Sequence, residues 1–203
     1  MSSSSPRPWV ATVAPPVALL VAVLVAPVWG GGHVGDNPTR MISVDNGGPW
    51  GEWGDPEFCP KRSHATGFQL KVEPHRGFFG DDTALNGVRL LCQDREVVTS
   101  SEGPRGTWSF PLSCGRGQRL VSFRLRVEAP RGLWDDTAAN DLDVTCSDGT
   151  VLEGQGGPAG TWGNWSVACP PAWGVCGLRT RLEPPQPRGD DTGLNGVEMF
   201  CCA

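Results

Sequence analysis

The sequence predicts an all-β fold made of three copies of one structural unit. The 203 residues include 28 glycines and 19 prolines, a density that interrupts helices and favours turns. Short segments alternate apolar with polar side chains, which is the pattern of half-buried strands. A nine-residue phrase also returns twice at nearly constant spacing, as in arrays of equivalent supersecondary units. These three features predict antiparallel sheets and argue against helical bundles, coiled coils and disordered chains.

The first 30 residues predict a secretory signal peptide. Arg7 gives a weakly positive start, Val17–Val25 form an apolar run, and small residues follow near Gly30. The apolar run is too short to span a bilayer. We therefore expect a secreted, extracellular protein without a membrane span, cleaved close to Gly30. An N-terminal extension over residues 31–45 would precede a single domain over residues 46–203.

The charge composition is acidic. Lys and Arg number 17 against 22 Asp and Glu, so the formal net charge is −5 at pH 7. No basic face is visible, which argues against a nucleic-acid partner. The acidic balance favours extracellular glycans or basic coat proteins as partners, and an ionic association with a coat protein would weaken with added salt.

The repeated phrase is Asp-Asp-Thr, followed three residues later by Asn in each copy. Its acidic pairs are Asp81 and Asp82, Asp135 and Asp136, and Asp190 and Asp191. A Gly-x-Trp lies upstream in each copy and places a tryptophan at Trp53, Trp108 and Trp162. One cysteine opens each copy and another closes it, at nearly equal spacing. Because the phrases stand 54 and 55 residues apart, the domain divides into copies of about 46–100, 101–155 and 156–203.

Each copy contains two predicted strands. The first strands are residues 68–72, 123–127 and 178–182, and the second strands are residues 88–92, 142–146 and 197–201. Thr180 is the one polar side chain at a predicted inward position. The copies therefore predict three antiparallel sheets of about four short strands, each with one apolar face. Three such faces are hidden from water only if the sheets turn toward a common axis.

The cysteine pattern predicts four disulfides. Eight cysteines follow the predicted signal peptide: Cys59, Cys92, Cys114, Cys146, Cys169, Cys176, Cys201 and Cys202. Pairing within copies would join Cys59 to Cys92 and Cys114 to Cys146 and staple each sheet, whereas bridges between copies are the alternative. The four cysteines of the third copy leave their pairing open. No C-x-x-C occurs and the histidines lack ligand spacing, so we expect no metal and no cofactor.

Taken together, these motifs resemble the vitelline membrane outer layer protein I family. The resemblance rests on the three Asp-Asp-Thr phrases, the upstream Gly-x-Trp, the closing Cys201-Cys202 and the segment Asn46–Gly51, and it covers residues 42–203. It implies a β-prism of three Greek-key sheets around a pseudo-threefold axis, secretion and four disulfides. It also implies a place in the outer layer of the egg's vitelline membrane or in other secretions. This chain departs from the family in its proline-rich N-terminal stretch and at Trp134.

The six aspartates are the candidate catalytic residues, although a structural role is favoured. Asp, Thr and Asn bond nearby backbone groups and start turns, which accounts for the residue types of the phrase. The alternative is a glycosidase-type pair, in which one carboxyl group is protonated and acts as the acid while its partner is ionised. The resemblance implies such an activity, a weak transglycosidase that elongates N-acetylchito-oligosaccharides. A calcium site is a third option, but the EF-hand spacing is absent.

The tryptophans are the candidate glycan-binding residues, because an indole stacks on a sugar ring and bonds its hydroxyls. Four of them break the repeat and are predicted to lie on the surface: Trp50, Trp134, Trp165 and Trp173. The three at equivalent positions are interpreted as core residues of their sheets. Asn164 begins an N-glycosylation sequon. The histidines are expected in exposed loops. We expect a structural or glycan-associated component of an extracellular coat or fluid.

Overall fold

The computed structural model describes residues 39–74, 83–129, 138–184 and 192–203. All described residues belong to one compact unit, Val34–Ala203. The predicted signal peptide over residues 1–30 therefore lies outside the described residues. Every regular element in the described ranges is a strand. Within these ranges no helix is long and apolar enough to cross a membrane.

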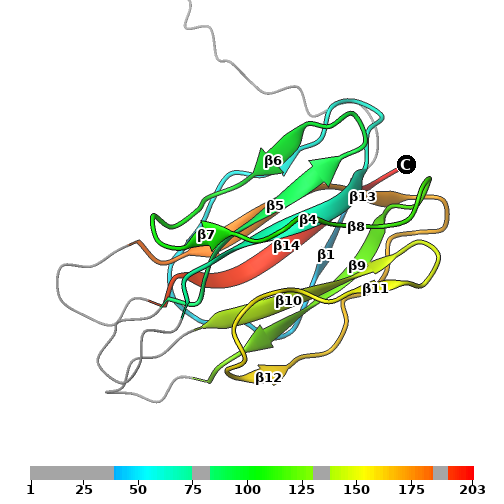
Figure 1. The fold of residues 1–203 in the computed structure, drawn as a ribbon. Coiled ribbons are helices and arrows are strands. Elements are labelled where there is room, and N and C mark those ends of the chain that lie inside the picture. The colour runs from blue at the N-terminus through cyan, green and yellow to red at the C-terminus, as the bar shows by residue number, and fades with distance from the viewer. Residues whose placement is uncertain (1–38, 75–82, 130–137, 185–191) are drawn as a thin grey trace, which may run out of the picture. The chain divides into compact units, whose positions relative to one another are not determined.

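Three antiparallel sheets make up the described part of the chain, and each is named here by its two long strands (Figure 1). The β4/β5 sheet contains β4 (Ala65–Val72), β5 (Leu85–Cys92), β6 (Val97–Thr99), β7 (Thr107–Trp108) and β8 (Leu112–Ser113). The β9/β10 sheet contains β9 (Leu120–Val127), β10 (Ala139–Cys146), β11 (Val151–Leu152) and β12 (Thr161–Trp162). The β13/β14 sheet contains β13 (Gly174–Leu182), β14 (Leu194–Cys202), β1 (Thr39–Ser43), β2 (Glu52–Trp53) and β3 (Glu57–Phe58).

The three sheets share one strand order. It runs β6-β5-β4-β7, then β11-β10-β9-β12, then β1-β14-β13-β2. In the first two sheets the fourth strand returns to lie beside the first, which is the Greek-key arrangement. The β13/β14 sheet has the same order only because strands from the start of the chain fill its third and fourth places. The start and the end of the described chain are thereby joined in one sheet.

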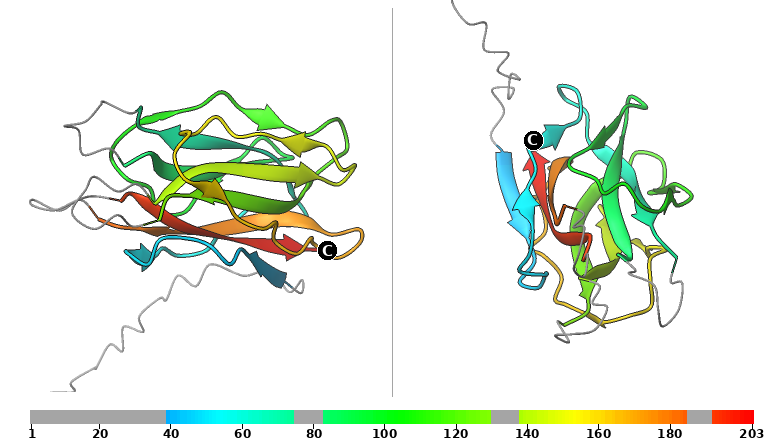
Figure 2. Two further views of the ribbon diagram at one scale, coloured as in Figure 1. Left: turned by 90° about the horizontal axis from the view of Figure 1, so that it is seen from below. Right: turned by 90° about the vertical axis from the view of Figure 1, so that its left-hand side faces the viewer.

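The long strands form because their apolar side chains alternate. In β4, Phe68 and Leu70 are fully buried, and each pairs with a buried residue of β5, Leu90 and Val88 respectively. The equivalent positions of β9 and β13 repeat the pattern, so the predicted first strands are confirmed. The buried side chains of all three sheets form one hydrophobic cluster, around which the sheets pack in both views of Figure 2.

Sheets and sequence copies are offset from one another. The Gly-x-Trp segment that opens each copy pairs with the first long strand of the preceding sheet: β2 with β13, β7 with β4, and β12 with β9. One copy therefore does not equal one sheet. Thr39–Ser43, which fall in the predicted N-terminal extension over residues 31–45, form β1 and pair with β14. This strand was not foreseen, because a five-residue segment with one buried side chain carries almost no periodic signal.

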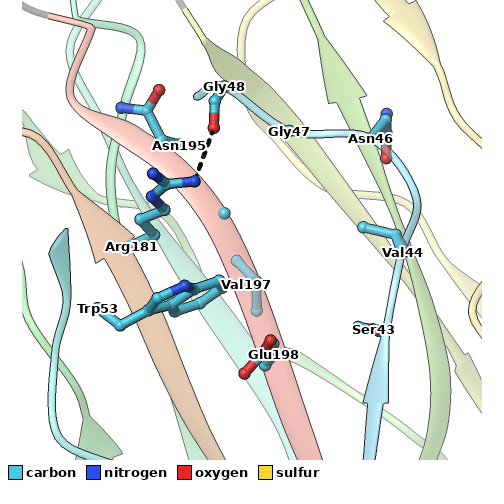
Figure 3. A pocket seen from close by; sticks show the side chains of 11 residues that line it. Ser43, Val44, Asn46, Gly47, Gly48, Trp53, Arg181, Asn195, Val197 and Glu198 are labelled. Atoms are coloured by element: carbon cyan, nitrogen blue, oxygen red, sulfur yellow. Dashed lines mark hydrogen bonds between the residues drawn. The ribbon is translucent and has the colours of Figure 1, made fainter. Parts of the chain in front are cut away.

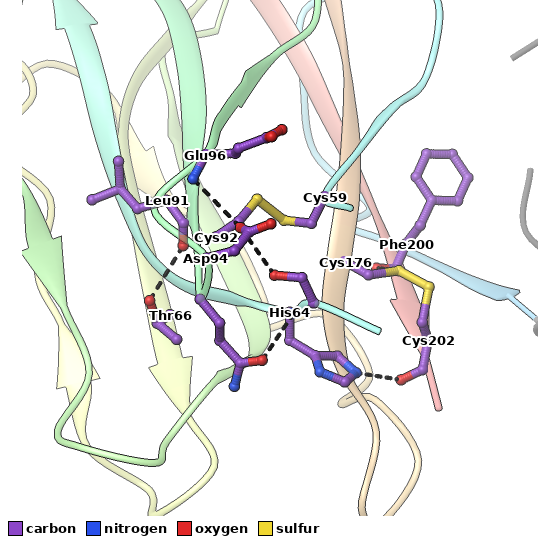
Figure 4. Close-up of a disulfide and its surroundings, with 12 residues drawn as sticks. Cys59, His64, Thr66, Leu91, Cys92, Asp94, Glu96, Cys176, Phe200 and Cys202 are labelled. Carbon is purple, nitrogen blue, oxygen red and sulfur yellow. Dashed lines mark hydrogen bonds between the residues drawn. A yellow bond between two sulfur atoms is a disulfide. The ribbon is translucent and has the colours of Figure 1, made fainter. Parts of the chain in front are cut away.

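The offset changes what the disulfides do. The N–H group of Cys59 donates to the Cys176 carbonyl and so extends the β13/β14 sheet, while its sulfur bonds Cys92 of the β4/β5 sheet (Figure 4). Cys114–Cys146 joins the β4/β5 sheet to the β9/β10 sheet in the same way, and Cys169–Cys201 joins the β9/β10 sheet to the β13/β14 sheet. The three bridges form a closed ring around the core.

The predicted pairs within copies are those found, and the third copy resolves into Cys169–Cys201 and Cys176–Cys202. The expectation that Cys59–Cys92 and Cys114–Cys146 each staple one sheet was wrong, because the opening cysteine of a copy belongs to the preceding sheet. Cys176–Cys202 alone joins two strands of one sheet. Beside it lies His64, which was expected to be exposed but is buried, with Nε2 at 3.2 Å from the Cys202 carbonyl oxygen.

Candidate functional site

The repeated phrase is built into the fold through its Thr and Asn. The Thr83 hydroxyl donates to Glu73 Oε2 over 2.8 Å, and the side-chain amide of Asn86 donates to Thr83 Oγ1. The third copy repeats the chain, because Asn195 Nδ2 donates to Thr192 Oγ1 over 2.7 Å and Thr192 bonds a glutamate in turn. All four Thr and Asn side chains are buried. This network supports the structural interpretation for the described part of the phrase.

The acidic pairs themselves lie outside the described residues. These are the six candidate catalytic residues Asp81, Asp82, Asp135, Asp136, Asp190 and Asp191. Their proposed roles in sugar transfer or calcium binding therefore stay predictions. Among the described residues no group of three or more His, Cys, Asp or Glu side chains is placed to hold a metal ion.

Sequence reasoning missed a glutamate that directly follows the first long strand of each sheet. Glu73, Glu128 and Glu183 each directly follow a first long strand and stand 55 residues apart. The backbone N–H of each glutamate donates to the carbonyl of the residue just before the second long strand, which is Ala84, Ala138 and Gly193 respectively. The constant spacing is the signal that identifies them as part of the repeat.

The three equivalent tryptophans lie on the outer faces of the sheets, so their interpretation as core residues was wrong. Trp53 is 39% exposed. The reason is register: each tryptophan stands opposite an outward basic residue of the first long strand, for example Trp53 opposite Arg181. Directly paired residues point to the same side of a sheet, so the indoles must point outward.

Each of these outer indoles stacks on a guanidinium group. The ring centroids of Trp53, Trp108 and Trp162 lie 4.9, 4.2 and 4.5 Å from the Cζ atoms of Arg179, Arg89 and Arg124, respectively. These distances are within the range of cation–π attraction. The stacking covers one face of each indole and leaves the ring partly exposed to solvent.

Of the four predicted surface tryptophans, two are exposed. Trp50 is 54% exposed beside β2, and Trp165 is 37% exposed with one face on Arg124. Trp173 instead packs against the hydrophobic core, and Trp134 lies outside the described residues. Asn164 of the sequon is exposed, and its side-chain amide donates to Asp45 over 3.1 Å. The side chain that would carry a glycan is therefore at the surface.

One pocket combines an exposed indole with charged groups. It has a volume of about 220 Å³ and lies on the outer face of the β13/β14 sheet (Figure 3). Trp53 packs over Gly196, where a Cβ would stand only 3.2 Å from the indole ring, and Val44 and Val197 are the other apolar lining residues. Arg181 and Glu198 border it with a guanidinium and a carboxylate. We call this site the Trp53 pocket.

Hydrogen bonds hold the charged groups of the Trp53 pocket in place. Arg181 donates to the carbonyls of Gly51 (3.1 Å), Gly48 (3.5 Å) and Pro49, which fixes both the guanidinium and the loop that faces it. Glu198 pairs with Arg179, the residue on which Trp53 stacks. Asn46 and Asn195 also border the pocket, and their Oδ1 atoms are buried without a hydrogen-bond partner.

A second pocket of about 400 Å³ lies on the β4/β5 sheet. Trp108 and Phe110 supply its aromatic surface, and Phe110 is 80% exposed. Gln69 and Gln155 are its amide side chains, and no charged residue is found among its described lining residues. This surface offers stacking and neutral hydrogen bonds without an ionic contact.

In the β9/β10 sheet, Asp141 occupies the position equivalent to Gly196. Burial raises the pKa of its carboxyl above 3.8, although N–H donors from Leu142 and Gly156 and the charge of Arg126 act in the opposite direction. Nearby Asp143 adds to the increase. Because the folded carboxyl binds its proton more tightly than the unfolded one, its contribution to stability is largest below pH 3.8 and declines as pH rises through the folded pKa.

Asp141→Asn should therefore gain stability relative to the wild type as pH rises from below 3.8 through that window. The measurement is the free energy of unfolding of both proteins between pH 3 and 7. The difference between the two proteins should change as pH rises through the folded pKa of Asp141 and stay constant above it. Asp148→Asn is the control of opposite sign, because backbone hydrogen bonding from Thr150 lowers the pKa of Asp148. A flat or falling Asp141→Asn difference would contradict the assignment.

Three Greek-key sheets around one core, tied by disulfides, define a disulfide-linked β-prism protein. The vitelline membrane outer layer protein I family model matches residues 40–203, and the chain belongs to that family. The Homo sapiens vitelline membrane outer layer protein 1 homolog is 51% identical over 170 residues, which cover 81% of this chain and 83% of that protein.

Solved structures confirm the β-prism fold. A prostate-specific WGA16 glycoprotein lectin superposes with a TM-score of 0.52 at 12% identity, over 81% of this chain and 97% of its own. AcmJRL, a mannose-binding jacalin-related lectin from Ananas comosus, gives 0.51 at 12% identity, over 81% and 97%. At this identity the likeness concerns the fold alone.

Proposed function

We propose that this chain is a secreted, disulfide-bonded component of an extracellular coat or fluid that binds glycans in the Trp53 pocket. The observation that carries the proposal is the pocket itself, in which a partly exposed indole stands over a glycine between a guanidinium and a carboxylate. A pyranose has apolar C–H faces and a rim of hydroxyls. An indole face with polar groups at its edges matches both.

The size and rigidity of the pocket support this use. A volume of about 220 Å³ is below the roughly 300–1,000 Å³ of pockets that enclose a drug-sized ligand. The pocket would therefore hold one sugar of a longer chain. Arg181 is already held by three carbonyls, so little side-chain entropy remains to be lost on binding. Lectins on the same fold, among them a mannose-binding one, make a glycan ligand a reasonable expectation here.

The disulfides support secretion. All four disulfides are formed and no free cysteine is present among the described residues. Bridges of this kind persist in oxidising compartments. Sugar transfer has less support, because it requires two carboxylates and Glu198 is the one acidic residue that lines the described Trp53 pocket.

Trp53→Ala is expected to weaken glycan binding at least about tenfold, which corresponds to a loss of about 1.4 kcal/mol, because the indole would be the central stacking surface of the site. Trp108→Ala is the matched control, because Trp108 has the equivalent place on the β4/β5 sheet. The measurement is isothermal titration with N-acetylglucosamine hexamer and with hyaluronan hexasaccharide. Binding of neither sugar would contradict the function, and a loss confined to Trp108→Ala would assign it to the second pocket instead.

A further inference from the structure

We propose that the Trp53 pocket takes a sugar that bears a carboxylate, with Arg181 as the group that binds it. The inference rests on the proposed glycan-binding function and specifies its ligand class. It comes from comparing the three sheets, which place a basic residue at the same outer position: Lys71, Arg126 and Arg181.

Two of these three cations have an acidic residue nearby. Lys71 Nζ lies 3.6 Å from Glu102 Oε2, and Arg126 stands directly opposite Asp141 in the β9–β10 pairing, close enough for its charge to act on that carboxyl. Arg181 has no carboxylate within 4 Å among the described residues, and its side-chain partners are backbone carbonyls. Carbonyls carry only partial charges, so among the described residues no full negative charge is paired with Arg181.

Glycines stand where the other two sheets carry their acids. Gly47 is equivalent to Glu102, and Gly196 is equivalent to Asp141. With glycine at both positions, Arg181 has neither of the acidic partners found in the other sheets. The absence of two side chains also leaves space for the pocket, since both glycines line it. A ligand carboxylate would restore the missing acid at the position where its equivalents act in the other sheets.

The guanidinium also keeps donors for such a ligand. Arg has five N–H donors, and the three carbonyls use three of them, which leaves two for a ligand. Charge-assisted hydrogen bonds between guanidinium and carboxylate are the stronger kind. Figure 3 shows the Trp53 ring between Arg181 and Glu198. A sugar over Trp53 would thus direct its carboxylate toward Arg181 and its hydroxyls toward the Glu198–Arg179 pair.

The acidic net charge of the chain does not prevent this contact. At physiological salt the Debye length is about 8 Å, so exposed acids beyond that distance are largely screened. Glu198, the acid at the pocket itself, is paired with Arg179. The local charge of Arg181 therefore dominates at the site.

The first test compares three probes at 0.15 M NaCl: hyaluronan hexasaccharide, 3′-sialyllactose and the neutral N-acetylglucosamine hexamer. We expect one of the acidic sugars to bind at least about tenfold more tightly than the neutral one. Preference for hyaluronan places the carboxylate within a chain, and preference for sialyllactose places it at a terminus. If all three sugars bind equally and binding depends on Trp53, the proposed preference for a carboxylate is overturned and glycan binding in the pocket stands. If none of them binds, both proposals are overturned.

A pair of variants tests Arg181 without changing it. Gly196→Asp places a carboxylate beside Arg181, and Gly196→Asn adds nearly the same volume without charge, so both displace the Trp53 ring alike. Gly196→Asp should weaken binding of the preferred acidic sugar about 10- to 100-fold relative to Gly196→Asn. Equal affinities would overturn the proposal. Thermal unfolding of both variants verifies that the fold is retained, and Arg181→Gln, expected to lose the preference for acidic sugars, provides an independent check.

Discussion

Replacing Cys59 and Cys92 together by alanine is expected to lower the free energy of unfolding by about 4 kcal/mol. The bridge spans 33 residues, and the chain-entropy model assigns roughly this value to a closed loop of that length. It is also one of three links in the ring that ties the sheets to each other. Its loss removes the covalent link between the β13/β14 and β4/β5 sheets at that end, where the contact between His64 and the Cys202 carbonyl remains.

The matched control is the double replacement of Cys176 and Cys202. With Cys169–Cys201 intact, this bridge closes only a small extra loop, because its cysteines lie seven and one residues from that neighbouring pair. The same model then gives about 2.5 kcal/mol. Thermal unfolding should show the Cys59/Cys92 variant melting several degrees below the control, at roughly 2–4 °C per kcal/mol. A lower melting temperature for the control would contradict the larger stabilising role assigned to the bridge between the two sheets.

Phe68→Ala is expected to cost about 3–5 kcal/mol, because Phe68 is fully buried and its removal leaves a cavity. It lies in the cluster that all three sheets share, so the cavity would border more than one sheet. Phe110→Ala is the control, since Phe110 is 80% exposed and should change stability by no more than about 0.5 kcal/mol.

Urea unfolding with the disulfides intact measures both variants. The expected result for Phe68→Ala is a lower transition midpoint with an unchanged m-value, because the surface exposed on unfolding stays nearly the same. Equal midpoints for Phe68→Ala and Phe110→Ala would mean that the shared core does not control stability.

The three-sheet arrangement could be predicted because its signals are local and repeated. Alternation such as Phe68-Gln69-Leu70 identifies a strand and its buried face without knowledge of its partner. The partner of a two-residue strand is set by the rest of the fold. The offset between copies and sheets, and with it the linking role of Cys59–Cys92, therefore could not be predicted from spacing.

The candidate site was harder to predict than the fold. The equivalent positions of Trp53, Trp108 and Trp162 suggested a shared core role, but pairing register turns all three outward. The Trp53 pocket combines two glycines, Gly196 and Gly47, of which each of the other sheets has one, at Gly87 and Gly156, and repeats are recognised by what their copies share. Arg181 became informative only when its carbonyl contacts could be compared with the acidic partners of Lys71 and Arg126.

The most direct measurement of the central claim is NMR of the tryptophan indole N–H groups. Each indole gives one cross-peak, so the rings report separately when the labelled protein is titrated with whichever of the three probe sugars binds most tightly. We predict that the Trp53 peak shifts with saturating dependence on sugar while the Trp108 and Trp162 peaks stay in place. Saturating shifts at Trp108 with an unmoved Trp53 peak, or no shift at any indole, would contradict glycan binding in the Trp53 pocket.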